Sequence, residues 1–529
     1  MIGYAQLWAA DPPAWGRAGA AWGGLVGRVD RWAEELTERV GRLHAGWSGG
    51  AAVAAGTRIN GLRGELRSVA PALIEADQVL AEFACRLGVA KARLAAAVER
   101  ADSAGVLIDR QGRVSADPAA LRPTHQSGPA VVQVAGGITA ALTLAGQADR
   151  EAAARLAELV DAAGSGWTRP PPPGRPPADA DPARVRAWWD GLTPAMRRWL
   201  VVHEPTLVGR LDGVPAAARD QANRLLVEDR RAELLAERNR VLTRLPRGPA
   251  ELLDLRRVDL ALAGLGALAE RLTRDESPRA YLLGLETGGE GRTIVALGNP
   301  DRADNVLTYV PGMTSGLADA TGELSRAARV RSRCAELAPD RETAALLWLD
   351  YDAPDFLHEA LRSGPARDAG PTLHQFQEGL RATHEGPPAR QTVLGHSYGS
   401  TVVGTAARDH GLAADALVFV GSPGVGVEHA GQLRVPPGQV WSSTAPDDVI
   451  RLTRPPEDLL RRATLTGTPL GVVTGLVDSS DGGLWFGRDP SHPGFGGRTF
   501  PSSRHGHTGY WEDGNPALDG MAGIVLGRG

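Results

Sequence analysis

The sequence is poor in the residues that mark disulfide-rich, metal-binding or nucleic-acid-binding proteins. Two cysteines, Cys85 and Cys334, are spread over 529 residues, which excludes a disulfide framework and favours two buried thiols. Neither His-Glu-x-x-His nor a paired Cys-x-x-Cys occurs, so no metal and no cofactor are predicted. Lys91 is the only lysine and the net charge is −4, so neither nucleic acid nor an anionic membrane surface is an expected partner.

Long hydrophobic runs are scarce as well. The first residues, Met1 to Tyr4 followed by Asp11-Pro12-Pro13, lack the basic segment and apolar core of a signal peptide. The most apolar span, 130–146, is short and contains Gln133 and three glycines, which predicts a small-residue helix or packed loop and no membrane span. A cytoplasmic location is therefore favoured, with export by a specialised route left open.

The most informative stretch is Thr392 to Ser400, TVLGHSYGS. It predicts a short apolar strand that leads into Gly-x-Ser-x-Gly, and a helix-compatible run, 401–408, follows. In a nucleophile elbow of this kind the serine sits on a strained turn and its hydroxyl projects above the sheet. Glycines at 395 and 399 remove the Cβ atoms that would collide where strand and helix approach closely. Ser397 is the predicted nucleophile.

An acid and a histidine should follow the serine in that order. Two further apolar runs, 416–421 and 439–443, precede Asp447-Asp448-Val449, and an acid just past a strand is where the orienting carboxylate belongs. Asp447 is the first choice and Asp448 the second, although Pro-Asp-Asp is also ordinary turn chemistry. In the Gly-rich segment near the C-terminus His507 is the preferred base and His505 the reserve, and the favoured reading of His505 is a surface loop residue.

The oxyanion hole should combine two backbone N–H groups. One belongs to Tyr398, directly after the nucleophile. The other belongs to Met313, in a loop after the predicted strand 306–310. A plain strand-to-helix connection, with Thr314 or Ser315 as the helix cap, is a compatible alternative reading of this loop.

Several separate motifs in this order resemble the actinobacterial α/β-hydrolases catalogued as DUF1023. The resemblance implies a serine hydrolase with Ser397, an acid and His507 as its triad. Members often carry Asp-Pro-Val at the acid position, and Asp447-Asp448-Val449 stands there in this chain, which favours Asp447. The matching segments are 309–313, 348–354, 395–399, 420–426 and 507–510, with others upstream at 188–193, 203–205, 209–215 and 219–224.

The N-terminal part is predicted to be helical from about residue 13 to 104, with apolar positions three and four residues apart. An interruption at 46–50, Gly-Trp-Ser-Gly-Gly, makes the pair resemble a WXG100-type helical hairpin. Trp47 would pack against the turn and Gly49 would permit the reversal. The Tyr-x-x-x-Asp or Glu export signal after the second helix is missing, so a helical interaction or capping module, with a possible helical protein partner, is favoured over secretion.

The remaining segments complete a domain scheme for a chain too long for one ordinary core. Residues 1–160 form a helical domain with a small β-hairpin at 105–114. Residues 161–182 form a Pro-rich linker and 183–275 a helical connecting region. Residues 276–529 alternate strands and helices, which predicts an α/β-hydrolase fold with a doubly wound, mostly parallel sheet. The aromatic stretch 465–500 is either a lid over Ser397 or an ordered loop packed on the core.

Three functions fit this scheme. The leading hypothesis is an esterase- or lipase-like serine hydrolase that acts on a small-molecule or lipid-like ester, with an apolar acyl chain bound near Trp441, Trp485 and Phe486. The second is acyl transfer on the same triad. The third is a non-catalytic hydrolase scaffold whose N-terminal helices bind a protein partner.

Overall fold

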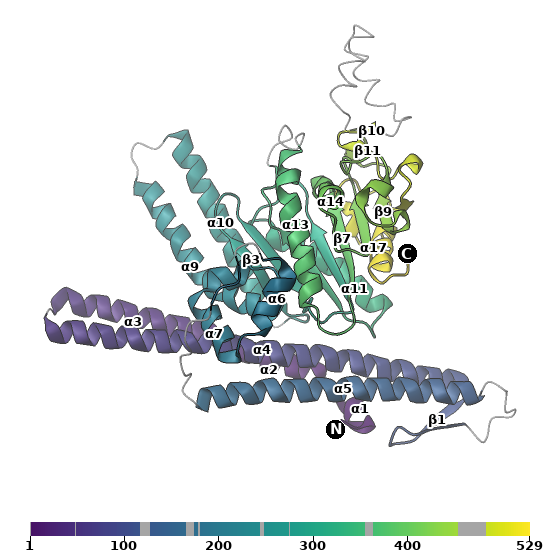
Figure 1. Ribbon diagram of the computed structural model, residues 1–529, viewed down its shortest axis with the longest axis horizontal. Coiled ribbons are helices and arrows are strands. Elements are labelled where there is room, and N and C mark those ends of the chain that lie inside the picture. The colour runs from purple at the N-terminus through teal and green to yellow at the C-terminus, as the bar shows by residue number, and fades with distance from the viewer. Residues whose placement is uncertain are drawn as a thin grey trace, which may run out of the picture.

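The computed structural model describes residues 2–47, 49–116, 127–164, 174–177, 180–243, 248–274, 276–354, 363–452 and 483–529. A twisted sheet with helices on both faces stands on a layer of long N-terminal helices (Figure 1). The chain passes from one part to the other through a group of shorter helices.

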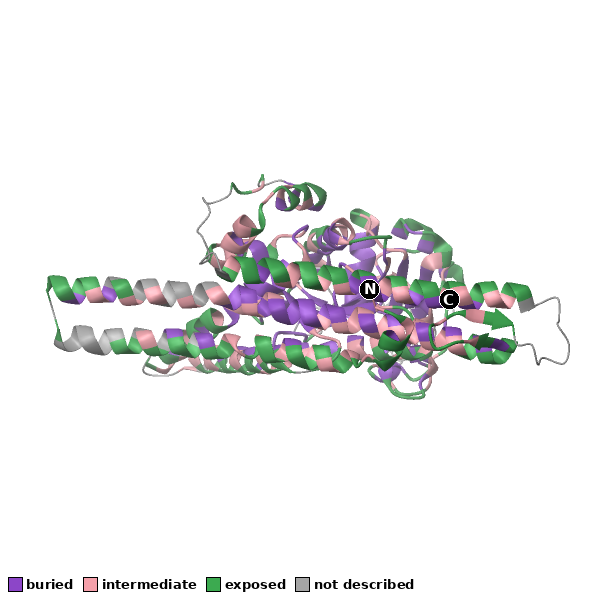
Figure 2. Cartoon of the chain, turned by 90° about the horizontal axis from the view of Figure 1, so that it is seen from below, coloured by how far each residue is buried: buried purple, intermediate pink, exposed green. Residues whose placement is uncertain are grey.

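The N-terminal layer is built around one very long helix, α4 (Gly50–Ala104). In Figure 2 this helix carries a buried stripe and lies between exposed neighbours. Small residues such as Ala90 and Ala141 allow α4 and α5 to approach closely, and Leu87 and Ile138 fill the space between them. The other helices are α1 (Tyr4–Ala9), α2 (Pro12–Gly23), α3 (Val26–Gly46) and α5 (Ser127–Gly164).

Helices α3 and α4 form the expected antiparallel pair. Gly49 has φ of 110°, a conformation that favours glycine, and so it permits the reversal. Trp47 is 42% exposed at the tip of this hairpin, which projects past the rest of the molecule (Figure 1). The predicted small hairpin is present as β1 (Val106–Ile108) paired with β2 (Val114–Ala116).

The predicted small-residue helix at 130–146 is part of α5. Of the described helices, α5 alone is long and apolar enough to cross a membrane, with 22% of its most apolar window buried. Ala141 and Ala145 of this window pack against α4. A helix that packs through small residues passes the same test of length and composition, so this one span is weak evidence for a membrane helix.

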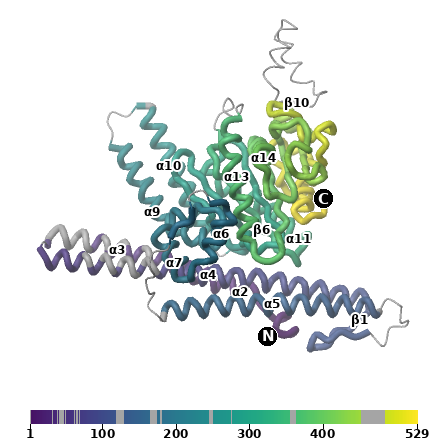
Figure 3. The backbone as a smooth tube through the Cα atoms, viewed as in Figure 1, coloured from purple at the N-terminus to yellow at the C-terminus, as the bar shows by residue number. Residues whose placement is uncertain are grey.

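The connecting region is helical, as predicted. Four of its helices begin with proline, whose fixed φ suits the first helical position and whose missing N–H costs nothing there. The two longest helices form a hairpin that projects away from the sheet (Figure 3). The helices are α6 (Pro182–Asp190), α7 (Pro194–His203), α8 (Pro205–Arg210), α9 (Ala216–Thr243) and α10 (Pro249–Thr273).

The sheet has the order β12-β9-β8-β7-β5-β6-β4-β3. Strands β5 to β9 and β12 are parallel, whereas β4 pairs antiparallel with β6, and β3 antiparallel with β4, at one edge. This confirms the predicted doubly wound, mostly parallel sheet. The strands are β3 (Ala280–Glu286), β4 (Arg292–Leu297), β5 (Asn305–Val310), β6 (Thr343–Leu349), β7 (Arg390–His396), β8 (Ala416–Val420), β9 (Val440–Ser443) and β12 (Arg498–Thr499).

Helices cover both faces of the sheet, so its central strands β5, β6 and β8 are mostly apolar and are buried throughout. Helices α11 (Ala320–Leu337) and α17 (Pro516–Val525) pack together on one face, and α13 (Gly364–Thr383) and α14 (Tyr398–Asp409) on the other (Figure 1). The carboxyl ends of the parallel strands therefore meet at one rim, where a site can form.

Buried polar contacts join the N-terminal layer to helix α9 and to the edge of the sheet. The amide of Gln78, on α4, donates to the carbonyl oxygen of Ala217 and to Asp220 Oδ2, both at 2.9 Å. Glu82 accepts from Asn299 Nδ2 at 2.7 Å and from the hydroxyl of Tyr281. Buried hydrogen bonds therefore join the helical layer to the rest of the molecule. Half of the predicted Pro-rich linker 161–182 lies outside the described residues.

Candidate active site

The nucleophile elbow has the predicted strand, turn and helix. Ser397 follows β7 directly, precedes α14, and has φ of 52°, which is rare for a residue with a Cβ. A Cβ on Gly399 would lie 2.3 Å from the carbonyl oxygen of Val310, and one on Gly395 would lie 2.5 Å from Ser400 Cα. Both glycines are therefore required by the close approach of strand and helix.

Three loops at the carboxyl rim bring Ser397, His507 and Asp448 into one chain of hydrogen bonds. His507 Nε2 lies 2.9 Å from Ser397 Oγ. On the other side of the ring, His507 Nδ1 lies 2.8 Å from Asp448 Oδ1 and 3.0 Å from Oδ2. Ser397 is 6% exposed, so its hydroxyl is largely shielded from water.

The preference for Asp447 over Asp448 does not agree with this geometry. The tight turn after β9, in which the Asp448 N–H donates to the carbonyl of Ala445, directs the Asp448 side chain inward and leaves Asp447 exposed. Asp447 instead accepts a 3.2 Å hydrogen bond from the backbone N–H of Gly506 and so anchors the loop that carries His507.

Tyr510 completes the surroundings of the carboxylate. Its hydroxyl donates to Asp448 Oδ2 at 2.5 Å and accepts from the Ala445 N–H at 2.9 Å. Burial alone would raise the pKa of Asp448, but hydrogen bonds from His507 and Tyr510 and the charge of His507 outweigh burial and lower that pKa. Sequence reasoning included Tyr510 only within a motif; its position three residues after the histidine was the available signal.

His396, the residue before the nucleophile, contacts the backbone and the ring of His507. Its Nε2 lies 2.9 Å from the carbonyl oxygen of His507, and the two ring centroids are 4.9 Å apart. Burial, followed by the nearby charges of His507 and Arg326, lowers the pKa of His396 to about 3. The ring is therefore neutral, and the nitrogen facing the carbonyl carries the hydrogen. Sequence reasoning missed this role.

The loop proposed to carry the second oxyanion donor lies against the nucleophile. A Cβ on Gly312 would come within 2.7 Å of Ser397 Cβ. Tyr351 donates to the carbonyl oxygens of Pro311 at 2.7 Å and Gly312 at 3.2 Å, so these carbonyls are turned toward Tyr351. Met313 follows in this loop, partly buried against the core. Tyr398 occupies the first turn of α14, whose N-terminus favours negative charge.

The structure also shows the surroundings of His505, the reserve base, and of the aromatic residues predicted to bind the acyl chain. His505 Nε2 faces Glu512 Oε2 at 3.5 Å, and the side chain is 41% exposed, so it fits the alternative reading as a surface residue. Trp441 packs beneath the guanidinium of Arg498, 4.6 Å from the ring centroid. Phe486 lies beside the elbow, with its ring 5.8 Å from that of Tyr398.

The stretch 465–500 is described only from Gly483 onward. Its Phe495 and Phe500 are buried in the core of the α/β part, which agrees with the packed-loop alternative for these two side chains. The segment 465–482, which would carry most of a lid, lies outside the described residues. Among the described residues, no group of three histidine, cysteine or acidic side chains is placed to hold a metal ion.

Comparisons with known proteins agree with the fold. A family model described as alpha/beta hydrolase matches residues 287–457. Uncharacterized protein Rv2079 of Mycobacterium tuberculosis (strain ATCC 25618 / H37Rv) is 32% identical over 383 residues, which cover 67% of this chain and 57% of the relative. Uncharacterized protein Mb0988c of Mycobacterium bovis is 33% identical over 204 residues, 37% of this chain and 76% of the relative. The chain thus spans less than two thirds of the longer relative.

Proposed function

Because this chain belongs to the α/β-hydrolase family, we propose that it is a serine hydrolase that cleaves carboxylic esters through an acyl-enzyme on Ser397, His507 and Asp448. The observation that carries the proposal is the pair of contacts made by one imidazole, Nε2 to the serine hydroxyl at 2.9 Å and Nδ1 to the carboxylate at 2.8 Å. A nucleophile, a base and an orienting group within hydrogen-bond reach form the arrangement that nucleophilic catalysis needs.

In the proposed reaction Ser397 Oγ attacks the ester carbonyl while His507 Nε2 takes the hydroxyl proton. Asp448 holds the imidazole in the tautomer with hydrogen on Nδ1 and stabilises the imidazolium that forms. The tetrahedral oxyanion would be bound by the N–H groups of Tyr398 and Met313. The C–O bond to the alcohol then breaks, the alcohol leaves with the proton from His507, and water enters by the same route to release the acid.

The choice of ester over amide follows the fold family, and the partly buried ring of Phe486 beside the elbow supports an apolar acyl chain. Acyl transfer to an alcohol remains the second outcome of the same acyl-enzyme. We also propose that the chain is related to the DUF1023 hydrolases and that its N-terminal helices form a WXG100-type hairpin.

The test uses the full chain and its Ser397→Ala variant with a fluorophosphonate probe. We expect an adduct on the parent and turnover of short and medium p-nitrophenyl esters, both lost in the variant. Added acceptor alcohols should yield no ester product if water is the natural acceptor. A well-folded parent that neither labels nor turns over these esters would refute the proposal.

A further inference from the structure

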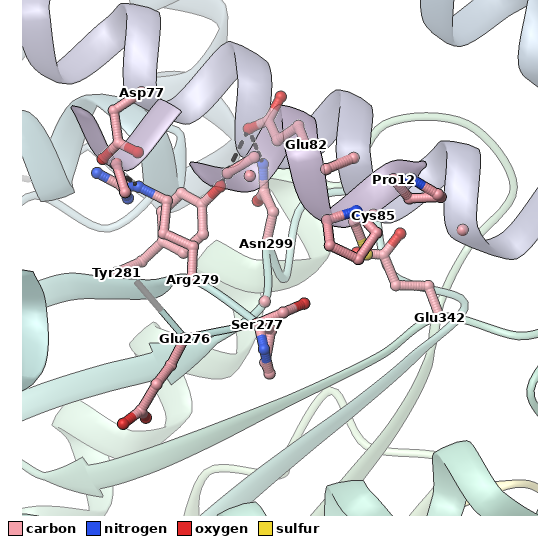
Figure 4. A pocket seen from close by; sticks show the side chains of 18 of the residues that line it. Pro12, Asp77, Glu82, Cys85, Glu276, Ser277, Arg279, Tyr281, Asn299 and Glu342 are labelled. Atoms are coloured by element: carbon pink, nitrogen blue, oxygen red, sulfur yellow. Dashed lines mark hydrogen bonds and ion pairs between the residues drawn. The ribbon is translucent and has the colours of Figure 1, made fainter. Parts of the chain in front are cut away.

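The N-terminal layer and the edge of the sheet enclose a hollow of about 580 Å³ (Figure 4). Charged side chains that line it hold the two parts together: Arg279 donates to Asp77 at 2.8 Å, and Glu82 accepts from Asn299 at 2.7 Å. These contacts have a structural role. A smaller hollow at the opposite edge of the sheet is lined by polar groups that such pairing does not use up.

This smaller hollow, the rim pocket, has a volume of about 340 Å³ and lies at the carboxyl ends of β9 and β12. The turn 489–493, Arg451 and Leu484 complete its walls. None of the three proposed catalytic residues is among the described residues that line it. The volume falls within the range of small-molecule sites.

Hydrogen bonds between its walls fix the shape of the rim pocket. Ser442 Oγ, on β9, donates to the carbonyl oxygen of Pro490 at 2.7 Å. The hydroxyl oxygens of Thr444 and Ser491 lie 2.9 Å apart, and the Ser491 N–H donates to Asp489 Oδ1 at 2.7 Å. The turn is thus tied to the end of β9. Because the walls are already in place, a ligand would not have to order them, which lowers the cost of binding.

Three polar side chains that line the rim pocket and are open to solvent keep capacity for further hydrogen bonds. Arg451 and Thr499 are exposed, and their side chains make no hydrogen bond with another described residue. His492 is half-buried, and its Nδ1 accepts from the Gly494 N–H at 3.0 Å. A ring that accepts at Nδ1 carries its hydrogen on Nε2, which is therefore a free donor.

The charges of the rim pocket balance, which indicates an uncharged ligand. Asp489 contributes one carboxylate and Arg451 one guanidinium, whereas a His492 that accepts at Nδ1 is neutral. Burial raises the pKa of Asp489, and the Ser491 N–H and the charge of Arg451 act against that rise. A carboxylate needs donors from the ligand, and the guanidinium and imidazole need acceptors. Hydroxyl groups supply both without a charge.

Two apolar side chains limit the shape of the ligand. Leu484 and Phe500 line the rim pocket beside the polar groups. A small ring with hydroxyl groups at its edge and C–H groups on its faces can contact both kinds of lining. A purely apolar ligand would remove water from the polar groups without replacing their hydrogen bonds, and this costs affinity.

We propose that the rim pocket binds an uncharged polyhydroxy ring compound, of the size of one pyranose sugar, through hydrogen bonds with Asp489, His492 and Arg451. One face of the ring would pack on Leu484 and Phe500. The pocket uses none of the proposed catalytic side chains, so this binding does not depend on the proposed hydrolase activity.

The test uses methyl α-D-glucopyranoside as the probe and the full chain, with binding measured by titration in saturation-transfer difference NMR. Asp489→Asn keeps an oxygen that can accept from the Ser491 N–H but removes the charge. His492→Asn keeps an acceptor for the Gly494 N–H but has no atom in the place of Nε2. His203→Asn, at an exposed position at the end of α7, is the matched control. Thermal midpoints check that all variants are folded.

We expect saturable binding of the glucoside in the parent and in the control, and a loss of affinity of about tenfold or more in both pocket variants. Methyl α-D-glucuronide, which carries a carboxylate, should bind more weakly, and cyclohexylmethanol, which has a ring and one hydroxyl, should not displace the glucoside. No saturable binding, or equal affinity in the pocket variants and the control, would overturn the proposal. Stronger binding of the glucuronide, or displacement by cyclohexylmethanol, would overturn the class of ligand.

Discussion

The hydroxyl of Tyr351 lies 2.7 Å from the carbonyl oxygen of Pro311 and 3.2 Å from that of Gly312. This one side chain therefore fixes the direction of two consecutive peptide groups in the loop beside Ser397. When the carbonyls of a loop are held on one side, its N–H groups are free to face the other. In the proposed reaction Tyr351 would therefore act on the oxyanion site through the backbone of this loop.

Tyr351→Phe should lower kcat for p-nitrophenyl esters by about tenfold, because loss of the anchoring hydrogen bonds amounts to roughly 1–1.5 kcal/mol of positioning. KM should change little, since the side chain does not reach the substrate. Tyr309→Phe is the matched control, because it removes a buried hydroxyl that donates to Glu323 of α11 at 2.6 Å and not to the loop carbonyls. Equal kcat in Tyr351→Phe and the control would remove Tyr351 from the catalytic account.

Substitution of the two adjacent aspartates should affect kcat very differently. Asp448→Asn keeps the shape but not the charge that holds the imidazole, so kcat should fall by about 10³–10⁴-fold. Asp447→Asn retains an oxygen that can accept from the Gly506 N–H, so its kcat should stay within about threefold of the parent. Comparable losses in both variants, measured at pH 8 with thermal midpoints as the folding check, would contradict the assignment of Asp448.

The buried imidazole of His396 should make the protein less stable in mild acid. Its pKa is lowered from 6.5 to about 3, so below pH 6.5 the unfolded chain binds a proton that the folded chain does not. The free energy of unfolding then falls by about 1.4 kcal/mol per pH unit, which gives about 2 kcal/mol at pH 5. This destabilisation continues to grow until the pH reaches the folded-state pKa.

Urea unfolding at pH 7 and pH 5 measures this effect. In His396→Asn the amide can still donate to the His507 carbonyl but cannot titrate, so the decrease in unfolding free energy between the two pH values should be smaller by about 2 kcal/mol. His203→Asn, which replaces an exposed histidine at the end of α7, should keep the parent's decrease. Other groups, such as the buried Asp301, whose pKa burial raises to about 6, contribute to parent and variants alike. Identical decreases in parent and His396→Asn would contradict a neutral, buried His396.

Features fixed by residues close together in the sequence could be predicted, whereas features that depend on distant residues could not. The elbow was predictable because strand and helix approach so closely that only glycine fits at 395 and 399. The parallel strands were predictable because buried strands appear in the sequence as apolar runs. The choice between Asp447 and Asp448 was not, because which of two neighbours in a turn faces inward depends on the loop carrying His507, some sixty positions away along the chain. The junction of the helical layer with the sheet edge depends on contacts such as Asp77 with Arg279, 202 positions apart, and Asp77 by itself looks like a charge on a solvated helix face.

The hydrogen bonds between Gln78 of the helical layer and helix α9 lead to a prediction about folding. Gln78 is fully buried and uses both ends of its amide: Nε2 donates to Ala217 O and Asp220, and Oε1 accepts from Gln221 at 2.8 Å. Gln78→Met keeps the volume but leaves buried polar atoms of α9 with fewer partners, which should lower the free energy of unfolding by about 2–3 kcal/mol. Gln133→Met, on the exposed face of α5, should change it by less than about 0.5 kcal/mol.

Because the same contact joins both parts of the molecule, the loss should appear equally in helix content and in ester turnover along one urea titration. Coincident transitions, shifted together in Gln78→Met, would mean that the helical layer is an integral part of the hydrolase. If the helices instead melted first while turnover persisted unchanged, the layer would be an independent module, and the scaffold that binds a helical partner would become the better account of residues 1–160.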